Sequence, residues 1–226
     1  MTRRNLLGGA GNTALWSNKL EGVPCFIIGN APSLNKVNLS LLENCFTIGI
    51  NRAFLSIDTT ILIWQDYAIW NQYKKKLQKL KSIKYCRKGA CTSSDFWFFN
   101  MSGRESKITM DPSHLYGRGS SGPLSYQLAY ALGCNPIVLL GMDCRYDKKG
   151  NTDFYGKNSM HREHTLPSCV KGLKWIRKNK HGKTVYNCSK NNVFEERFKL
   201  EEVLEKCGDK VFVDRKEIIK KLSKKY

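Results

Sequence analysis

Short runs of apolar residues recur along this chain, and each run stops at a small cluster of glycine and polar residues. An unbroken apolar run of this length is typical of a strand that is buried on both faces of a parallel sheet. The sequence therefore predicts a sheet whose strands end in polar residues. The clearest runs are VPCFIIGN (23–30), CFTIGINRA (45–53), TTILIWQD (59–66) and NPIVLLGMD (135–143).

Segments with helical spacing separate these runs. Ile69, Tyr73, Leu77 and Leu80 recur at intervals of about three and four residues, which predicts a helix over 67–82. The alternation of strands and helices predicts an α/β fold: a Rossmann-like, mainly parallel sheet with helices on both faces and a small lid region. Further helices are expected over 120–134, 166–182, 198–209 and 213–226, and further strands over 83–88, 96–99 and 183–189, with the rest of 89–119 as loop.

The 226 residues are expected to form a flexible leader (1–22) and a single α/β domain (23–226). No apolar run approaches the roughly 18 residues that span a bilayer, and the N-terminus is a poor secretory signal, so we expect a cytoplasmic protein. The nine cysteines include no C-x-x-C pair, and reduced thiols are expected.

The chain is strongly basic. It carries 38 Lys and Arg against 19 Asp and Glu, a net charge of +19. Such a surplus indicates a polyanionic partner, either nucleic acid or an anionic glycan. The alternative is a lysine-rich surface that is merely solvated. We also expect a homo-oligomer.

The carboxyl ends of the predicted strands carry most of the candidate site residues. Ligands of open α/β sheets bind beyond these ends, and the free N–H groups at the start of a helix favour an anion. The residues concerned are Gly29, Asn30 and Ser33 after the first strand, Asn51 and Arg52 after the second, Gln65 and Asp66 after the third, Asp143 after the fourth, and Ser120, Ser121 and Gly122 at the start of the helix over 120–134.

Each cluster also has a purely structural explanation. GNAPSL could be a turn, in which Pro32 fixes φ and Ser33 caps the next segment. Ser120, Ser121 or Asp66 could cap a helix. The functional interpretation rests on the repeated placement of polar residues at the same end of successive strands. The standard P-loop, GxGxxG and GxSxG motifs do not occur in this context.

Four segments resemble one known family. CFIIGNAPSL, FTIGINRAFL, GSSGPLSYQLAYALGCNPIVLLGMD and VYNCS look like the family that contains the bacterial lipooligosaccharide sialyltransferases, the archaeal-type 6-hydroxymethylpterin diphosphokinases and many uncharacterised phage-encoded relatives. The resemblance covers roughly residues 23 to 190 with the spacing preserved, and the phage-encoded members are the most similar. It implies that 23–226 is a nucleotide-binding transferase domain.

The resemblance also implies roles for individual residues. Asn30, Ser33 and Asn51 would contact the donor nucleotide, and Asp143 would lie at the floor of the cleft. Ser120, Ser121 and Gly122 would bind phosphate or base. His164 falls where the sialyltransferases carry the histidine that deprotonates the acceptor, with His161 as the competing candidate. Tyr146 and Tyr155 are candidates for the tyrosines that assist the leaving phosphate.

His164 also has an independent argument. The polar, aromatic segment 145–164 follows a strand end, and such loops often carry function. A neutral imidazole can accept a proton from a hydroxyl near pH 7. A surface histidine is the alternative, and a zinc site of His161, His164 and Cys169 would lack an evident fourth ligand.

Three functions follow from these observations. The first is a glycosyltransferase that uses a CMP- or UDP-linked sugar donor and an anionic acceptor, either a glycan or modified DNA. The second is an ATP-dependent diphosphokinase of the 6-hydroxymethylpterin type, which would require Mg²⁺ held by carboxylates such as Asp66 or Asp143. The third is a non-enzymatic nucleic-acid-binding protein. Fold alone does not choose among them.

Overall fold

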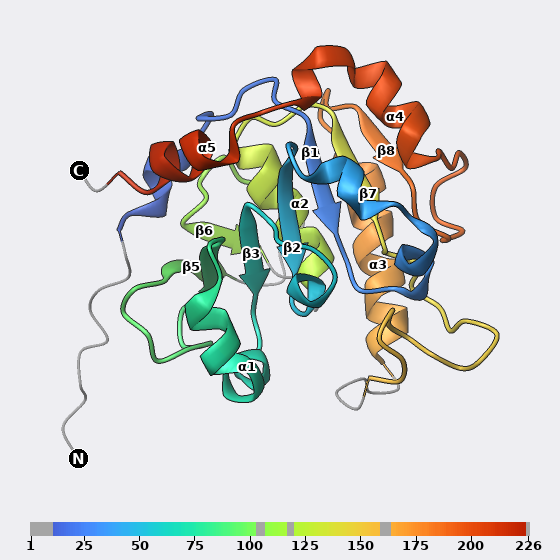
Figure 1. Cartoon of the computed structure of the whole chain (residues 1–226), viewed down its shortest axis with the longest axis horizontal. Coiled ribbons are helices and arrows are strands. Elements are labelled where there is room, and N and C mark those ends of the chain that lie inside the picture. Colours follow the sequence, from blue (N-terminus) through green and yellow to red (C-terminus); the bar gives the residue numbers. More distant parts are fainter. Residues whose placement is uncertain (1–10, 103–106, 117–119, 159–163, 225–226) are drawn as a thin grey trace.

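Eight parallel strands form the centre of the protein. The computed structural model describes residues 11–102, 107–116, 120–158 and 164–224. Within these ranges the strands form one sheet in the order β6-β5-β4-β3-β2-β1-β7-β8, and all neighbouring pairs are parallel (Figure 1). Their bounds are β1 Cys25–Ile28, β2 Phe46–Ile50, β3 Ile61–Trp64, β4 Ile83–Arg87, β5 Trp97–Ser102, β6 His114–Tyr116, β7 Ile137–Leu140 and β8 Val185–Asn187.

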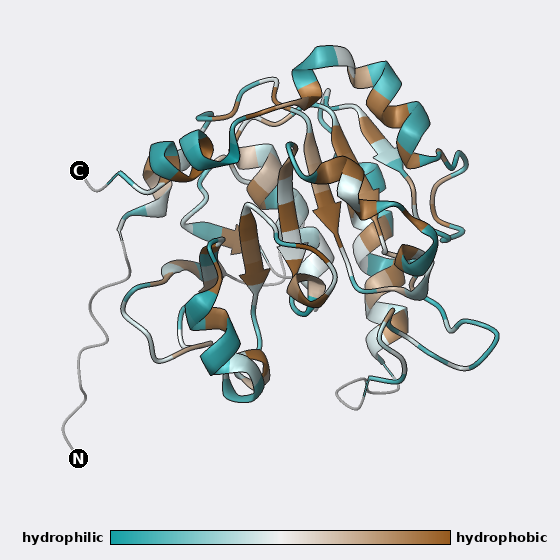
Figure 2. Ribbon diagram, viewed as in Figure 1, coloured by the Kyte–Doolittle hydropathy of each residue, from teal (hydrophilic) through white to brown (hydrophobic). Residues whose placement is uncertain are grey.

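Helices cover both faces of this sheet, as the sequence predicted. One face packs against α2, α3 and α5, and the other packs against α4 near β1 and β7 and against α1 near β3 and β4. Figure 2 shows the central strands as apolar and the outer sides of the helices as polar. The helices are α1 Tyr67–Lys79, α2 Ser121–Ala131, α3 Thr165–Lys178, α4 Leu200–Cys207 and α5 Arg215–Leu222, with 3-10 turns η1 Thr13–Trp16, η2 Pro32–Lys36, η3 Leu39–Leu42, η4 Ala53–Leu55 and η5 Gly208–Val211. None of the helices within the described ranges is long and apolar enough to cross a bilayer.

The position of β1 in the sheet explains why its sequence is apolar at every position and not only at alternate ones. Cys25 and Ile27 enter the cluster under α2 and α3, whereas Phe26 and Ile28 enter the cluster under α4. All four side chains are fully buried. Successive side chains of a strand point to opposite faces, so a strand covered on both sides needs apolar residues at every position.

Part of the expected leader is instead a packed element. Residues 1–10 lie outside the described ranges, but η1 rests on the sheet. Trp16 is only 2% exposed, and its Nε1 donates a hydrogen bond to the carbonyl oxygen of Leu222 at 2.7 Å. Its ring lies 5.5 Å from that of Tyr85 and 4.9 Å from that of Trp97. A large indole with a satisfied N–H anchors this segment because it buries apolar area without leaving a donor unpaired.

Strand β6 lies within the region that the sequence assigned mostly to a loop. It has three residues, and its outer edge is occupied by a side chain. Gln127 of α2 accepts a hydrogen bond from the Tyr116 N–H at 3.1 Å and donates one to the Tyr116 carbonyl at 2.6 Å. A fully buried amide thus takes the place of a further strand.

The order of the strands reverses direction at β1. The chain proceeds from β1 to β2, β3 and β4 on one side, and later returns to place β7 on the other side of β1. Crevices at such a reversal are the usual ligand sites of open α/β sheets. The fold therefore points to the carboxyl ends of β1 and β7 as the place to look for a site.

Candidate functional site

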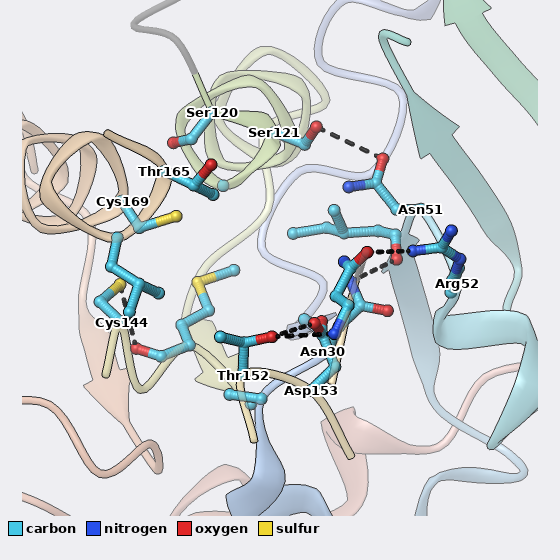
Figure 3. Close-up of a pocket in the computed structure, with 18 of the residues that line it drawn as sticks. Asn30, Asn51, Arg52, Ser120, Ser121, Cys144, Thr152, Asp153, Thr165 and Cys169 are labelled. Carbon is cyan, nitrogen blue, oxygen red and sulfur yellow. Dashed lines mark hydrogen bonds between the residues drawn. The ribbon is translucent and has the colours of Figure 1, made fainter. Parts of the chain in front are cut away.

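A cleft of about 640 Å³ opens at these strand ends. Its walls come from the segments after β1, β2, β3 and β7, from the start of α2, and from the first half of α3. Figure 3 shows Asn51 and Arg52 on one side of the cleft, with Cys144 and Cys169 on the opposite side and Ser120 and Ser121 between them at the start of α2. The cleft brings together most of the residues that the sequence singled out.

Gly29 lets two strand ends approach each other. A Cβ atom at Gly29 would lie 2.2 Å from the carbonyl oxygen of Gly141, at the end of β7. The same oxygen accepts a hydrogen bond from the N–H of Ala31 at 2.9 Å. Gly29 lines the cleft, but the space that its missing side chain leaves is filled by protein backbone.

Asn30 presents an unsatisfied acceptor in the cleft wall. Its Nδ2 donates to the carbonyl oxygen of Ile50 at 3.0 Å. A carbonyl oxygen can only accept a hydrogen bond, so the NH₂ group of Asn30 must face Ile50, and the orientation of the amide is fixed. The Asn30 Oδ1 atom is buried and has no hydrogen-bond partner within the described ranges. A buried acceptor of this kind favours a ligand that offers a hydroxyl or N–H group.

Asn51 adopts a backbone conformation that most residues avoid. Its φ is +51°, in the left-handed region where asparagine is among the better-tolerated residues. Its Oδ1 accepts a hydrogen bond from Ser121 Oγ at 3.5 Å, and Gln65 Nε2 donates to the same serine at 3.4 Å. Strained residues of this kind concentrate at functional sites.

The start of α2 offers free N–H groups to the cleft. No capping side chain is present among the described residues: Ser120 is extended and makes no side-chain capping bond. Ser121 and Gly122 occupy the first two helical positions, and Pro123 at the third has no N–H to offer. All four residues line the cleft. The first N–H groups of a helix and its dipole favour an anion such as phosphate.

Arg52 is a buried cation in the cleft wall. It is 3% exposed and lines the cleft. Its Nε donates to Tyr73 Oη at 3.1 Å, and its Nη2 donates to Gln72 Oε1 at 2.6 Å, both in α1. Its Nη1 donates to Tyr155 Oη at 2.8 Å and to Asn158 Oδ1 at 2.9 Å. Arg52 therefore joins the end of β2 to α1 and to the segment that carries Tyr155.

A tight turn presents Tyr155 to the cleft. The backbones of Asp153 and Gly156 exchange two hydrogen bonds, of 3.2 and 3.0 Å, across this turn. The N–H of Phe154 donates to the carbonyl oxygen of Asn30 at 2.6 Å, which fixes the turn against the end of β1. Burial raises the pKa of Tyr155, and the nearby Asp153 carboxylate adds to the rise, while Arg52 opposes it. Tyr155 is therefore a neutral phenol at physiological pH.

Ser33 and Asp143 bind each other. The N–H of Ser33 donates to Asp143 Oδ2 at 3.1 Å, and its Oγ donates to Asp143 Oδ1 at 2.7 Å. The N–H of Lys190 also donates to Oδ1 at 2.8 Å. Asp143 lines the cleft, but Ser33 does not. The structure thus places Ser33 behind the cleft, where it ties η2 to the end of β7.

His164 lies at the cleft mouth and directly precedes α3. It is exposed and lines the cleft together with Thr165 and Cys169. The position of α3 depends on Gly172, because a Cβ atom there would lie 2.8 Å from the ring of Pro123 and 2.9 Å from Ser120 Oγ. This close packing brings His164 to the same cleft as the start of α2.

One candidate does not line the cleft, and another falls outside the described ranges. Tyr146 is 60% exposed and is not among the residues that line the cleft. His161 lies outside the described ranges. Asp66 lines the cleft and directly precedes α1, but it makes no side-chain capping bond.

Several lining residues were not singled out from the sequence. Thr152, Asp153, Asn158, Cys144 and Thr165 all contribute to the walls. Asp153 and Asn158 flank Tyr155 in the polar segment TDFYGKN, which was the available signal. Among the described residues, no three His, Cys, Asp or Glu side chains are grouped so as to hold a metal ion.

Comparison with solved structures finds similar folds in two known proteins. The MAf glycosyltransferase from Magnetospirillum magneticum AMB-1 superposes with a TM-score of 0.56 at 15% identity, over 95% of this chain and 41% of its own. This chain therefore spans about two fifths of that protein. The sialyltransferase CstII from Campylobacter jejuni, in complex with the substrate analogue CMP-3FNeuAc, covers 73% of this chain and 80% of its own, with 14% identity and a TM-score of 0.44. At these identities the likeness concerns the fold.

Comparison of the sequence adds nothing further. No protein-family model matches the chain, and no curated protein matches it significantly. The function must therefore be argued from the cleft.

Proposed function

We propose that this protein is a glycosyltransferase that moves a sugar from a nucleotide-linked donor to a hydroxyl group of its acceptor. The observation that carries the proposal is the cleft at the strand reversal, where an uncapped helix start, a buried cation and an unsatisfied amide oxygen converge. The likeness of the fold to a glycosyltransferase supports the same class. A CMP- or UDP-linked sugar is the donor that we propose.

The polar groups of the cleft suit a nucleotide. The N–H groups of Ser121 and Gly122 would hold a phosphate. Asn30 Oδ1, which has no donor among the described residues, would accept a hydrogen bond from a ribose or sugar hydroxyl. Asn51 lies between these groups and contacts Ser121. Holding the donor in this way supplies positioning and charge neutralisation, which are large contributions to group transfer.

His164 is the proposed general base. The acceptor oxygen would attack the anomeric carbon, the bond from that carbon to the phosphate oxygen would break, and the nucleotide would leave with the bonding electrons. The imidazole would take the proton of the acceptor hydroxyl. Tyr155 lines the same cleft, and its hydroxyl oxygen accepts a hydrogen bond from Arg52. The net charge of +19 suits an acceptor that is itself anionic, a glycan or modified DNA.

The diphosphokinase alternative requires carboxylates that are free to bind a metal ion. It needs Mg²⁺, and Asp143 was one of its expected ligands. Both oxygens of Asp143 already accept hydrogen bonds from Ser33 and Lys190. This leaves Asp66 and Asp153 as the other carboxylates of the lining. We therefore keep the diphosphokinase as an outcome of the test and not as the proposal.

A nucleotide panel tests the proposal. Thermal unfolding would be followed with CMP, UDP, GDP, ADP and ATP, each with and without Mg²⁺. A ligand at a hundred times its Kd adds about 2.7 kcal/mol of stability. We expect a shift with CMP or UDP that does not depend on the metal, followed by release of sugar from the matching donor. A shift only with Mg²⁺ and ATP would overturn the proposal in favour of the diphosphokinase.

The variant His164→Ala tests the proposed base. We expect kcat to fall by about 10²- to 10⁴-fold while the Kd for the nucleotide stays close to that of the parent protein. The matched control is His181→Ala, because His181 lies after α3 and outside the cleft lining. Equal activities for the two variants would remove His164 from the mechanism.

A further inference from the structure

Arg52 is a buried cation whose hydrogen-bond partners are all neutral. Two phenol oxygens and two amide oxygens surround its guanidinium. The rings of Tyr73 and Tyr155 also face it, with centroids 5.5 and 5.3 Å from Cζ. Among the described residues, no carboxylate forms an ion pair with Arg52. Buried charges in proteins are normally paired with an opposite charge.

The neutral partners satisfy the geometry of the guanidinium, but no ion pair among the described residues compensates its charge. Dipoles of hydroxyl and amide groups replace part of the lost hydration. An anion placed beside the same group would gain much more, because Coulomb interactions are strong where water is excluded. The wall of the cleft at Arg52 is thus predisposed to receive a negative group from a ligand.

Two hydrogen-bond donors remain at this wall. A guanidinium has five N–H groups, and the four contacts of Arg52 use four of them. The remaining N–H is on Nη2. The Tyr155 oxygen accepts from Arg52, and no atom of the described residues accepts the Tyr155 hydroxyl proton. A donor that itself accepts from a cation is polarised and becomes a better donor.

This wall is separate from the phosphate site at the start of α2. Asn51 lies between the two, since its side chain contacts Ser121 and its backbone continues into Arg52. Figure 3 shows Ser121, Asn51 and Arg52 following one another along the cleft. A ligand with its phosphate at α2 would therefore reach Arg52 with a different group.

We propose that Tyr155, supported by Arg52, binds a second anionic group of the ligand. The group is either the second phosphate of a nucleoside diphosphate or a carboxylate on the transferred sugar, and both present oxygens that suit the same donors. This inference rests on the proposed function, because it assumes that a nucleotide occupies the cleft. It identifies the ligand class as one with two separate negative groups.

Calorimetric titration distinguishes a second phosphate from a sugar carboxylate as the group that Tyr155 binds. One arm compares UDP with UMP and CDP with CMP, and measures the gain from a second phosphate. The other arm compares a non-reactive CMP-linked acidic sugar with the same molecule carrying a neutral amide in place of the carboxylate, and measures the gain from the carboxylate. In the parent protein we expect one arm to show a gain of about tenfold or more in affinity.

Three variants test whether the gain in affinity depends on Tyr155 and Arg52. Tyr155→Phe removes only the hydroxyl and leaves Arg52 its other partners. Arg52→Gln removes the charge. Arg145→Gln is the matched control, because Arg145 is exposed and outside the cleft lining. We expect the first two variants to reduce the gain to less than about threefold with little change in the Kd for the monophosphate, and the control to keep the full gain.

The outcomes separate this proposal from the proposed function. A parent protein with equal affinity for both members of each pair, or a gain that survives in Tyr155→Phe, overturns the subsite even if sugar transfer is observed. A gain that depends on Tyr155, in a protein that transfers no sugar, supports the subsite and overturns the glycosyltransferase. Failure to bind any nucleotide overturns both. Tyr155→Phe keeps the test valid if Arg52→Gln does not fold.

Discussion

Asp143 has both carboxylate oxygens engaged by protein donors, and this limits what else it can do. It is 6% exposed and accepts hydrogen bonds from two backbone N–H groups and one hydroxyl. These bonds connect η2, the end of β7 and the turn at Lys190. We interpret Asp143 as the residue that fixes the floor of the cleft.

The variant Asp143→Asn tests this interpretation. An amide has one acceptor oxygen in place of two, and its NH₂ group would face the donors of Ser33 or Lys190. We expect the free energy of unfolding to fall by about 2–3 kcal/mol, measured by urea denaturation. Ser33→Ala should lower it by less, because only the hydroxyl contact is lost. Unchanged stability in Asp143→Asn together with lost activity would instead make Asp143 a ligand-binding group.

Residues such as Ser33 show where the sequence is ambiguous. A serine after a strand end has the same appearance whether it contacts a ligand or a neighbouring loop, and only the position of Asp143 decides the matter. Gly29 is similar, since the sequence presents it as a candidate ligand-binding residue, whereas in the structure the carbonyl of Gly141 fills the space that a side chain would need. The placement of Asn30, Asn51 and Ser121 in one cleft was predictable because parallel strands end at the same edge.

At the scale of elements, η1 is a structural part of the domain. Trp16 packs on Tyr85 and Trp97 and is bonded to the end of α5. The segment therefore joins β4 and β5 to the last helix, which is more than 200 residues away along the chain. It contributes to the stability of both.

The variant Trp16→Ala should be strongly destabilising. Loss of a fully buried indole costs about 3–5 kcal/mol, and the Leu222 carbonyl would also lose its donor. Leu15→Ala is the matched control, because Leu15 is 44% exposed and should change stability by less than about 0.5 kcal/mol. Urea denaturation followed by far-UV circular dichroism measures both. Similar values for the two variants would show that η1 does not contribute to the core.

The elements differ in how well the sequence predicts them. The buried strands and the long helices have strong patterns, and the structure places them where they were expected. β6 has three residues in a region rich in glycine and serine, which is too short for a periodic signal. It is held by Gln127, a contact between residues that no local pattern links. Tertiary contacts also order η1, which has no periodicity of its own.

At the scale of the whole molecule, charge is the dominant property. The net charge of +19 attracts polyanions regardless of their sequence. Binding of this kind releases counterions, so it weakens steeply as the salt concentration rises. A ligand held by directed hydrogen bonds in the cleft should respond much less.

This contrast provides a test of the acceptor. We expect duplex DNA and an anionic glycan both to bind, with affinities that fall at least about tenfold between roughly 50 and 200 mM salt. Nucleotide affinity should change by less than about threefold over the same range. Fluorescence anisotropy with labelled DNA and calorimetry with the nucleotide measure the two. Binding of DNA that is insensitive to salt would contradict a surface-charge mechanism.

The position of β1 in the sheet has a consequence for synthesis on the ribosome. β1 can pair with β2 once both have emerged, but its other neighbour, β7, is translated roughly a hundred residues later. At about 5–20 residues per second, the inner edge of the nascent sheet stays open for on the order of ten seconds. During that interval one edge of β1 is unpaired, although β1 is apolar and lies at the centre of the finished protein. This edge is available to chaperones or to another nascent chain. The strand that leads into the cleft is thus also the point at which this protein is most exposed to misassembly while it is being made.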